Sequence, residues 1–166
     1  MKAKLYLETT IPSYLAARPS RDLLVAAHQQ ITHEWWDFRR SEFDLYVSEL
    51  VILEASAGDA VIANRRLELL AGIPVLAVSD EILELAEELV GGGTIPRKAV
   101  RDATHIATAA VYECEFLLTW NCRHIANAEL QRTMRRVVED HEYELPSLCT
   151  PDELMGERAY VERPDR

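Results

Sequence analysis

Three acidic residues stand where the surrounding apolar pattern makes a carboxylate unusual. Glu8 directly follows the apolar run LYL, which reads as the end of a strand. Glu54 lies within LVILEAS, which predicts a helix that is apolar on nearly every face. Asp102 lies in the first turn of the helix predicted for VRDATHIATAA. Because an unpaired buried charge costs several kcal/mol, each carboxylate needs a cation or another partner if it is buried.

Each of these carboxylates also has an ordinary structural explanation. Glu8 can be a loop residue, and Glu54 can pair with an arginine on a helix that is less buried than its sequence suggests. Asp102 can be placed in its first turn by the helix dipole alone, since the positive end of the dipole favours an anion. Position in the fold has to decide between these alternatives.

The segments around the carboxylates alternate between apolar runs of strand length and longer stretches of helical period, which is typical of an α/β fold with a parallel sheet. The pattern predicts four or five strands, at residues 4–7, 43–47, 74–78, 116–119 and 147–150. Thr10 is predicted to cap a short first helix and Ser48 to cap the helix that carries Glu54. The other helices are predicted at residues 21–40, 59–70 and 80–90, from residue 100, and at 127–141. One side of the helix at 21–40 is predicted to bear Leu24, His28, Ile31, Trp35 and Phe38.

In a parallel sheet the ends of the first and fourth strands meet the starts of neighbouring helices at one edge. Glu8, Glu54, Asp102 and Asn121, which closes the run FLLTWN, would then share a pocket. Several carboxylates repel one another unless cations lie between them, and oxygen ligands favour Mg²⁺ or Mn²⁺. Such ions activate water and stabilise the leaving oxygen of a phosphodiester. The residues therefore predict metal-dependent phosphoryl chemistry.

Composition sets the remaining limits. The 166 residues contain no internal linker, and we expect one domain over residues 1–156 followed by a loosely ordered charged tail at 157–166. The formal net charge of −10 excludes a generally basic surface but leaves room for local basic patches. No apolar run approaches the roughly 18 residues of a membrane span, and no leader pattern opens the chain, so we expect a soluble cytoplasmic protein. Three cysteines without CxxC spacing fit a reducing compartment: Cys114, Cys122 and Cys149.

Other side chains near these segments allow competing interpretations. A zinc site can be drawn from His105, Cys122 and His124, although their spacing matches no standard zinc motif. Trp35, Trp36 and Trp120 can stack on bases, but the spacing of Trp35 favours core packing and directs Trp36 elsewhere.

Two groups of cations are candidates for contacts with phosphates. Arg97, Lys98 and Arg101 precede Asp102 and are the better candidates for binding the phosphates of a nucleic acid. A second group lies along the late helix and can instead pair with acidic residues of that helix: Arg132, Arg135 and Arg136, opposite Glu129, Glu139 and Asp140.

Four ordered motifs resemble those of the PIN-domain ribonuclease family: YLETTIPSYL, VSELVILEAS, IPRKAVRDATHIATAA and LLTWNCRHIANA. They are most similar to the branch of VapC-like toxins that carries a WNxxHI segment, and the resemblance extends from about Lys4 to Leu154. It implies a three-layer α/β/α sandwich around a parallel sheet, and cleavage of RNA that depends on Mg²⁺ or Mn²⁺. It also implies a cognate antitoxin protein as a partner, and a homodimer.

Carried over by motif, the resemblance makes Glu8, Glu54, Asp102 and Asn121 the catalytic metal ligands. It implies that Thr9 or Thr10 and Thr119 orient ligands or water, and His105 is expected beside them as a hydrogen-bonding neighbour. The family pattern usually has Asp at the position of Glu8, and the extra methylene moves the carboxylate by about 1.5 Å.

The leading hypothesis is thus a metal-dependent ribonuclease that acts as the toxin of a toxin–antitoxin pair. Glu8 and Asn121 motivate an alternative, a degenerate PIN domain with weak or no nuclease activity that serves as a binding or regulatory module. A small Mg²⁺ phosphohydrolase is a weaker possibility, because the sequence lacks the aspartyl-nucleophile pattern of such enzymes.

Overall fold

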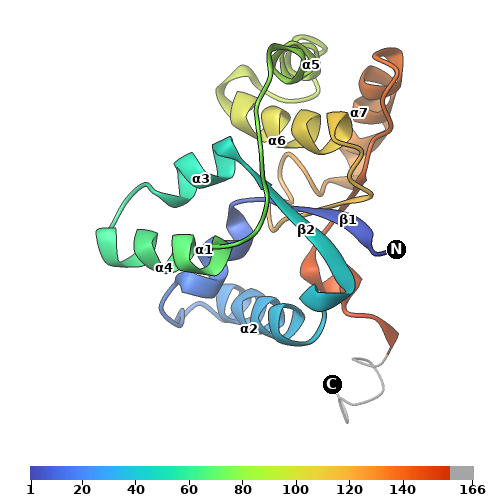
Figure 1. Cartoon of the computed structure of the whole chain (residues 1–166). Helices are drawn as coiled ribbons and strands as arrows, with labels where there is room; N and C mark the ends of the chain where they lie inside the picture. The colour runs from blue at the N-terminus through green and yellow to red at the C-terminus, as the bar shows by residue number, and fades with distance from the viewer. Residues whose placement is uncertain (158–166) are drawn as a thin grey trace.

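The predicted alternation of strands and helices is present in the computed structural model, which describes residues 1–157 and is drawn in Figure 1. The strands are β1 (Ala3–Leu7), β2 (Phe43–Ser48), β3 (Val75–Leu76), β4 (Phe116–Leu118) and β5 (Ser147–Cys149). The α-helices are α1 (Thr10–Ala16), α2 (Leu23–Phe38), α3 (Glu49–Ala55), α4 (Ala60–Leu70), α5 (Asp80–Gly91), α6 (Val100–Val111) and α7 (Ala128–Asp140). Short 3₁₀ helices are η1 (Arg40–Glu42), η2 (Arg97–Ala99) and η3 (Pro151–Leu154). Apart from Glu157, the predicted charged tail lies outside the described residues.

All five strands pair in parallel, in the order β3-β2-β1-β4-β5. The central strand β1 places Tyr6 opposite Tyr46 of β2 and opposite Leu117 of β4. From β1 the chain first builds outward through β2 and β3, and then crosses to the other side of β1 for β4 and β5. The change of direction between β1 and β4 is the point at which ligands collect in open parallel sheets. The predicted parallel α/β fold is confirmed.

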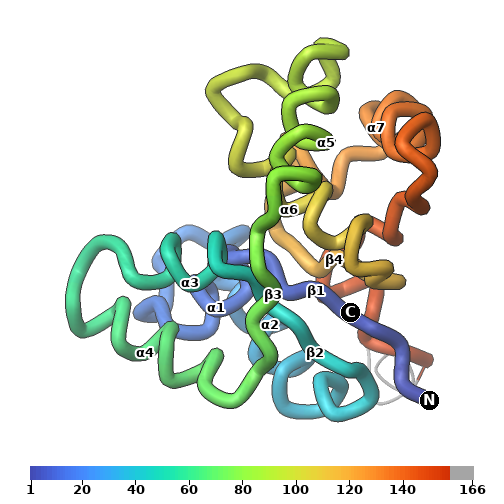
Figure 2. The backbone as a smooth tube through the Cα atoms, turned by 45° about the horizontal axis from the view of Figure 1, so that its top comes forward, coloured from blue at the N-terminus to red at the C-terminus, as the bar shows by residue number. Residues whose placement is uncertain are grey.

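Helices cover both faces of the sheet, which gives the three layers seen in Figures 1 and 2. Helices α1, α2 and α4 lie on one side, and α5, α6 and α7 lie on the other. Because β1 is enclosed between these layers, Leu5, Tyr6 and Leu7 are all buried instead of alternating between core and solvent.

Side-chain caps define where several helices begin. As predicted, Ser48 caps α3, and its Oγ accepts a hydrogen bond from Val51 N at 3.3 Å. The prediction for Thr10 is wrong, because Thr10 is the first residue of α1 and Thr9 occupies the cap position without a side-chain cap bond. The Thr10 hydroxyl donates instead to the carboxylate of Glu8, which is a stronger acceptor than any uncharged group in the turn.

Two predicted apolar surfaces are less buried than their patterns suggest. On α2, Ile31 and Trp35 are buried, but Leu24 and Phe38 are 75% and 73% exposed. A helix of 16 residues spans about 24 Å and a strand of five about 17 Å, so a strand of this length does not cover the whole of α2. Helix α3 has only seven residues, and Leu53 faces solvent. The helix that carries Glu54 is therefore less buried than its apolar sequence suggests, which matches the ordinary alternative given for Glu54.

Other sequence expectations concern the tryptophans and cysteines. Trp35 is fully buried and packs against Phe43, which confirms its place in the core, while Trp36 is partly buried beneath the Arg40 guanidinium. All three cysteines are free. Within residues 1–157, no helix has both the length and the apolar character needed to cross a membrane.

Removing a side chain from the centre of this sheet should destabilise the fold. Leu117 is fully buried on β4, so Leu117→Ala should lower the free energy of unfolding by about 2–5 kcal/mol. Leu24→Ala, at an exposed position, is the matched control and should change it by less than about 0.5 kcal/mol. Urea denaturation followed by circular dichroism measures both. Equal losses in the two variants would contradict the assignment of β4 to the core.

Candidate metal centre

Three side chains from separate segments come together at the carboxyl edge of the sheet. Glu8 follows β1, Glu54 lies on α3, and His105 lies on α6. Ligand atoms of these three residues all lie within 4.8 Å of one another, so the group can hold a metal ion. The carboxyl edge of the sheet, the last turn of α3 and the middle of α6 therefore meet.

One oxygen of Glu8 is held by three hydrogen bonds. Its Oε2 accepts from Thr10 N at 3.0 Å, from Thr10 Oγ1 at 2.5 Å and from Thr119 Oγ1 at 2.7 Å. Within residues 1–157, Oε1 of Glu8 accepts no hydrogen bond. Glu8 is 5% exposed, so these donors compensate for the water that the carboxylate has lost. Its second oxygen is left for a cation.

Glu54 is tethered in the same way. Its Oε1 accepts from Thr9 Oγ1 at 2.7 Å and lies 2.7 Å from His105 Nε2, whereas Oε2 accepts no hydrogen bond from the described residues. Burial by itself would raise the pKa of Glu54, but the hydrogen bonds from His105 and the Thr9 hydroxyl and the charge of Arg101 lower it. The pKa of Glu54 consequently lies below its ordinary value of 4.5.

A buried hydrogen-bonded chain supports His105 from behind. His105 Nδ1 lies 2.7 Å from Tyr6 Oη, which lies 2.7 Å from Ser48 Oγ. Burial raises the pKa of Tyr6 well above its ordinary value of 10.0, so the phenol stays neutral. Sequence reasoning missed Tyr6 and Ser48 as parts of this site. The available signal was the hydroxyl group of Tyr6, which lies between two leucines in the strand KLYL and two residues before Glu8.

Asp102 and Asn121, the other two predicted ligands, lie outside the group of three and have partners of their own. His124 Nδ1 lies 2.8 Å from Asp102 Oδ2. Asn121 Oδ1 accepts a hydrogen bond from His124 N at 3.0 Å and so stabilises the turn after β4. Asp102 precedes His105 by three residues on α6, which places both on one side of that helix. Their roles as metal ligands stay predictions.

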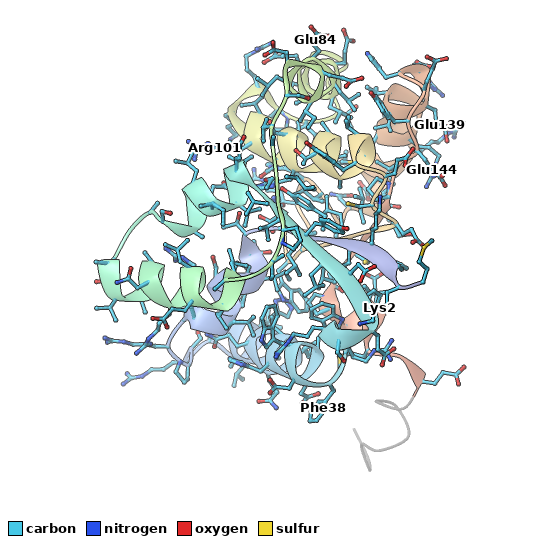
Figure 3. The ribbon with its side chains drawn as sticks, viewed as in Figure 1. Lys2, Phe38, Glu84, Arg101, Glu139 and Glu144 are labelled. Carbon is cyan, nitrogen blue, oxygen red and sulfur yellow. The ribbon has the colours of Figure 1, made fainter. Side chains whose placement is uncertain are left out.

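The basic residues predicted to contact RNA lie around the start of α6. Arg97, Lys98 and Arg101 are all exposed, and Arg97 pairs with Glu87 at 3.2 Å. Arg101 is close enough to Glu54 to lower the pKa of that carboxyl, and Figure 3 shows it near the end of α6 that faces α3. The stripe on α7 has no ion pair with Glu129, Glu139 or Asp140 in the described part of the chain, so the predicted helix-surface pairing is wrong.

Trp120 anchors the turn that follows β4. Its backbone N donates to Thr10 Oγ1 at 2.8 Å, and its Nε1 donates to Thr32 Oγ1 at 2.7 Å. The indole is stacked on His28, with 3.9 Å between ring centroids and an angle of 11°. One face of the indole is therefore already covered, and the contacts hold Thr10 and Thr119 near Glu8.

The donor set fits a hard divalent cation. Glu8 Oε1 and Glu54 Oε2 are carboxylate oxygens without hydrogen bonds from residues 1–157, and Mg²⁺ and Mn²⁺ favour such ligands. The alternative zinc set of His105, Cys122 and His124 does not assemble. His105 contacts Glu54, and His124 contacts Asp102. Among the described residues, Glu8, Glu54 and His105 form the only group of three or more His, Cys, Asp or Glu side chains that could hold a metal ion.

The fold and this donor set define a PIN-like α/β/α protein with a candidate cation site at the carboxyl edge of the sheet. No protein-family model matches the sequence, and no curated protein matches it. Among solved structures, the chain is similar to one in the crystal structure of VapBC2 from Rickettsia felis bound to a DNA fragment from their promoter. That match has a TM-score of 0.52 and 14% identity, and covers 72% of this chain and 89% of the other. The motif resemblance to PIN-domain proteins is thus confirmed at the level of the fold.

The lowered pKa of Glu54 predicts a particular pH dependence of stability. A lowered folded-state pKa contributes stability that is fully present above the unfolded value, near 4.5, and is lost as the pH falls through the folded value. Glu54→Gln lacks this contribution. The difference in unfolding free energy between wild type and Glu54→Gln should therefore be largest at neutral pH and shrink below pH 4.5.

Urea denaturation at a series of pH values measures this difference. Glu84→Gln, at an exposed position of α5 without a hydrogen bond in the described part of the chain, is the matched control. A difference that grows on acidification would show that Glu54 is not stabilised in its ionised form.

Proposed function

We propose that this protein is a metal-dependent endoribonuclease that hydrolyses RNA phosphodiesters and acts as the toxin of a toxin–antitoxin pair. The observation that supports the proposal is the pairing of Glu8 with Glu54 at the carboxyl edge of a PIN-like sheet, each with one oxygen tethered and the other without a hydrogen bond from residues 1–157. Such a pair suits a cation more than it suits burial alone, since two tethered carboxylates still repel each other.

In this proposal Glu8 and Glu54 would hold the cation, Mg²⁺ or Mn²⁺. A bound ion of this kind supplies an activated water and stabilises the leaving oxygen of a phosphodiester. Thr9, Thr10 and Thr119 keep the carboxylates oriented through the hydrogen bonds to their other oxygens.

The substrate side of the proposal rests on charge near the start of α6. Lys98 and Arg101 are exposed there and would neutralise RNA phosphates, while Asp102 lies one turn from His105 as a further carboxylate. A protein antitoxin and a second copy of the chain are the partners that we propose, on the basis of the motif resemblance and of the structural match.

Cleavage should depend on both the cation and the acidic residues. Purified protein with Mn²⁺ should cut single-stranded RNA, a chelator should stop the reaction, and added Mn²⁺ should restore it. Glu54→Gln should abolish cleavage because it removes a carboxylate of the group, and Asp102→Asn should abolish it because it removes the further carboxylate one turn from His105. Asp44→Asn is the matched control and should retain full activity. Asp44 is exposed on β2, and its register partner is Lys4 near the amino end of β1, away from the carboxyl edge. Electrophoresis of labelled RNA gives the readout, and cleavage that persists in Glu54→Gln would refute the proposal.

A second candidate function is a binding or regulatory module without nuclease activity. The partners of Asp102 and Asn121 favour it, because His124 contacts both residues and neither lies in the group of three. Asp102 is held by His124, and position 121 carries a neutral amide. The only carboxylates in the group of three are then Glu8 and Glu54, which is a small negative charge for binding a catalytic cation.

Asn121→Asp separates the two candidates. A carboxylate at position 121 can still accept the hydrogen bond from His124 N, so the turn is preserved while the negative charge near the site increases. For an enzyme with weak cation binding we expect cleavage at limiting Mn²⁺ to increase about tenfold. Absence of cleavage in both wild type and Asn121→Asp, with RNA binding retained, would support the binding module.

A further inference from the structure

Three buried side chains form one hydrogen-bonded chain that ends on the partly buried Glu54. Ser48 Oγ, Tyr6 Oη and His105 Nδ1 are linked by contacts of 2.7 Å, and His105 Nε2 continues to Glu54 Oε1 at 2.7 Å. Ser48 and Tyr6 are fully buried and His105 is 1% exposed, so water does not complete any of these bonds. Every proton in the chain must therefore find its acceptor within the protein.

The helix cap determines the direction of the chain at its far end. Ser48 Oγ already accepts from Val51 N, because Ser48 caps α3. Its own hydroxyl proton has one remaining partner among the described residues, the phenol oxygen of Tyr6. If Ser48 donates to Tyr6, the phenol proton is free to donate to His105 Nδ1.

The other protonation forms of His105 leave at least one proton of the chain without an acceptor. An imidazolium would donate from Nδ1 to Tyr6, and one of the two hydroxyl protons, on Tyr6 or on Ser48, would then have no acceptor. A neutral imidazole protonated on Nδ1 would do the same and would also place the lone pair of Nε2 against a carboxylate oxygen at 2.7 Å. The neutral form protonated on Nε2 satisfies every donor.

We propose that Ser48 and Tyr6 fix His105 as the neutral Nε2–H tautomer, so that His105 serves as a hydrogen-bond donor to Glu54 and is not a ligand of the cation. Both nitrogens of His105 are then engaged, Nδ1 as an acceptor from Tyr6 and Nε2 as a donor to Glu54. Tyr6 acts through His105 and is a positioning residue. This inference rests on the proposed function only where it concerns the cation.

The two oxygens of Glu54 consequently have different roles in the site. Oε1 takes two donors, His105 Nε2–H and Thr9 Oγ1–H, and these hold the carboxylate while Oε2 has no hydrogen bond from the described residues. The apparent triad of Glu8, Glu54 and His105 thus reduces to two carboxylate ligands. Such a set favours Mg²⁺ or Mn²⁺ over zinc, which binds well to imidazole.

The tautomer can be measured directly on the wild-type protein without metal. Long-range ¹H–¹⁵N NMR of protein with ¹⁵N-labelled histidine, at neutral pH, should show His105 with a protonated Nε2 and an unprotonated Nδ1. His105→Gln identifies the signals. A protonated Nδ1, alone or together with Nε2, would overturn the inference, and this measurement requires no nuclease activity.

Tyr6→Phe tests the positioning role. The variant removes the donor to His105 Nδ1, so His105 should become a mixture of tautomers and Mn²⁺ affinity, measured by electron paramagnetic resonance, should fall about tenfold. Tyr46→Phe is the matched control, because Tyr46 is the register partner of Tyr6 on β2 and makes no side-chain hydrogen bond within residues 1–157. An unchanged tautomer and affinity in Tyr6→Phe would contradict the proposal; if Tyr6→Phe does not fold, the wild-type NMR result decides.

Pulsed electron paramagnetic resonance of the Mn²⁺-loaded wild type tests the second half of the proposal. Coupling from a directly bound histidine nitrogen should be absent, and its presence would overturn the inference. The two proposals can also fail separately. An Nε2–H tautomer in a protein that never cleaves RNA would remove the proposed function alone, and cleavage by a protein with an Nδ1–H tautomer would remove this inference alone.

Discussion

The mutual repulsion of two carboxylates held at the end of a buried sheet is the constraint around which this site is built. Glu8 and Glu54 approach within the same small group, and their charges oppose both burial and proximity. Each is kept in place by donors that bind only one of its oxygens: the backbone and hydroxyl of Thr10 with Thr119 for Glu8, and Thr9 with His105 for Glu54. In the proposed function, a cation would compensate each carboxylate at the oxygen that has no donor.

The fold supplies these donors from segments that are far apart in the sequence. Thr119 follows β4 and reaches Glu8 because β1 and β4 are neighbours, and Glu8 N donates to Leu118 O at 3.0 Å across the same strand ends. The cap that starts α3 also ends the hydrogen-bonded chain behind His105. One serine therefore sets where a helix begins and, through Tyr6, how an imidazole is oriented. Secondary structure and site geometry depend on the same contacts.

Much of this arrangement could be predicted from the sequence, because it follows from periodicity. Apolar runs and helical spacing predicted the parallel sheet, the cap at Ser48 and the meeting of Glu8 with the helix of Glu54. The partners of Asp102 and Asn121 could not be predicted in this way. Both meet His124 in an irregular turn after β4, where side-chain direction depends on backbone dihedrals and not on a repeating pattern. The role of Tyr6 could not be predicted for a different reason. Its ring fits the apolar pattern of β1, and only its hydroxyl takes part in the hydrogen bonds behind His105.

The acidic character of the chain does not prevent action on a polyanion, because charge acts over a short range. At physiological ionic strength, interactions between exposed charges fade beyond about 8 Å, so most of the carboxylates that produce the net charge of −10 have little influence at the site. The groups that matter are those near the edge of the sheet. There Arg97 is paired with Glu87, whereas Arg101 is close enough to affect Glu54 and has no ion pair within residues 1–157. A cation between Glu8 and Glu54 would balance their two charges, and the local field met by a phosphate would then be set by Arg101 and Lys98.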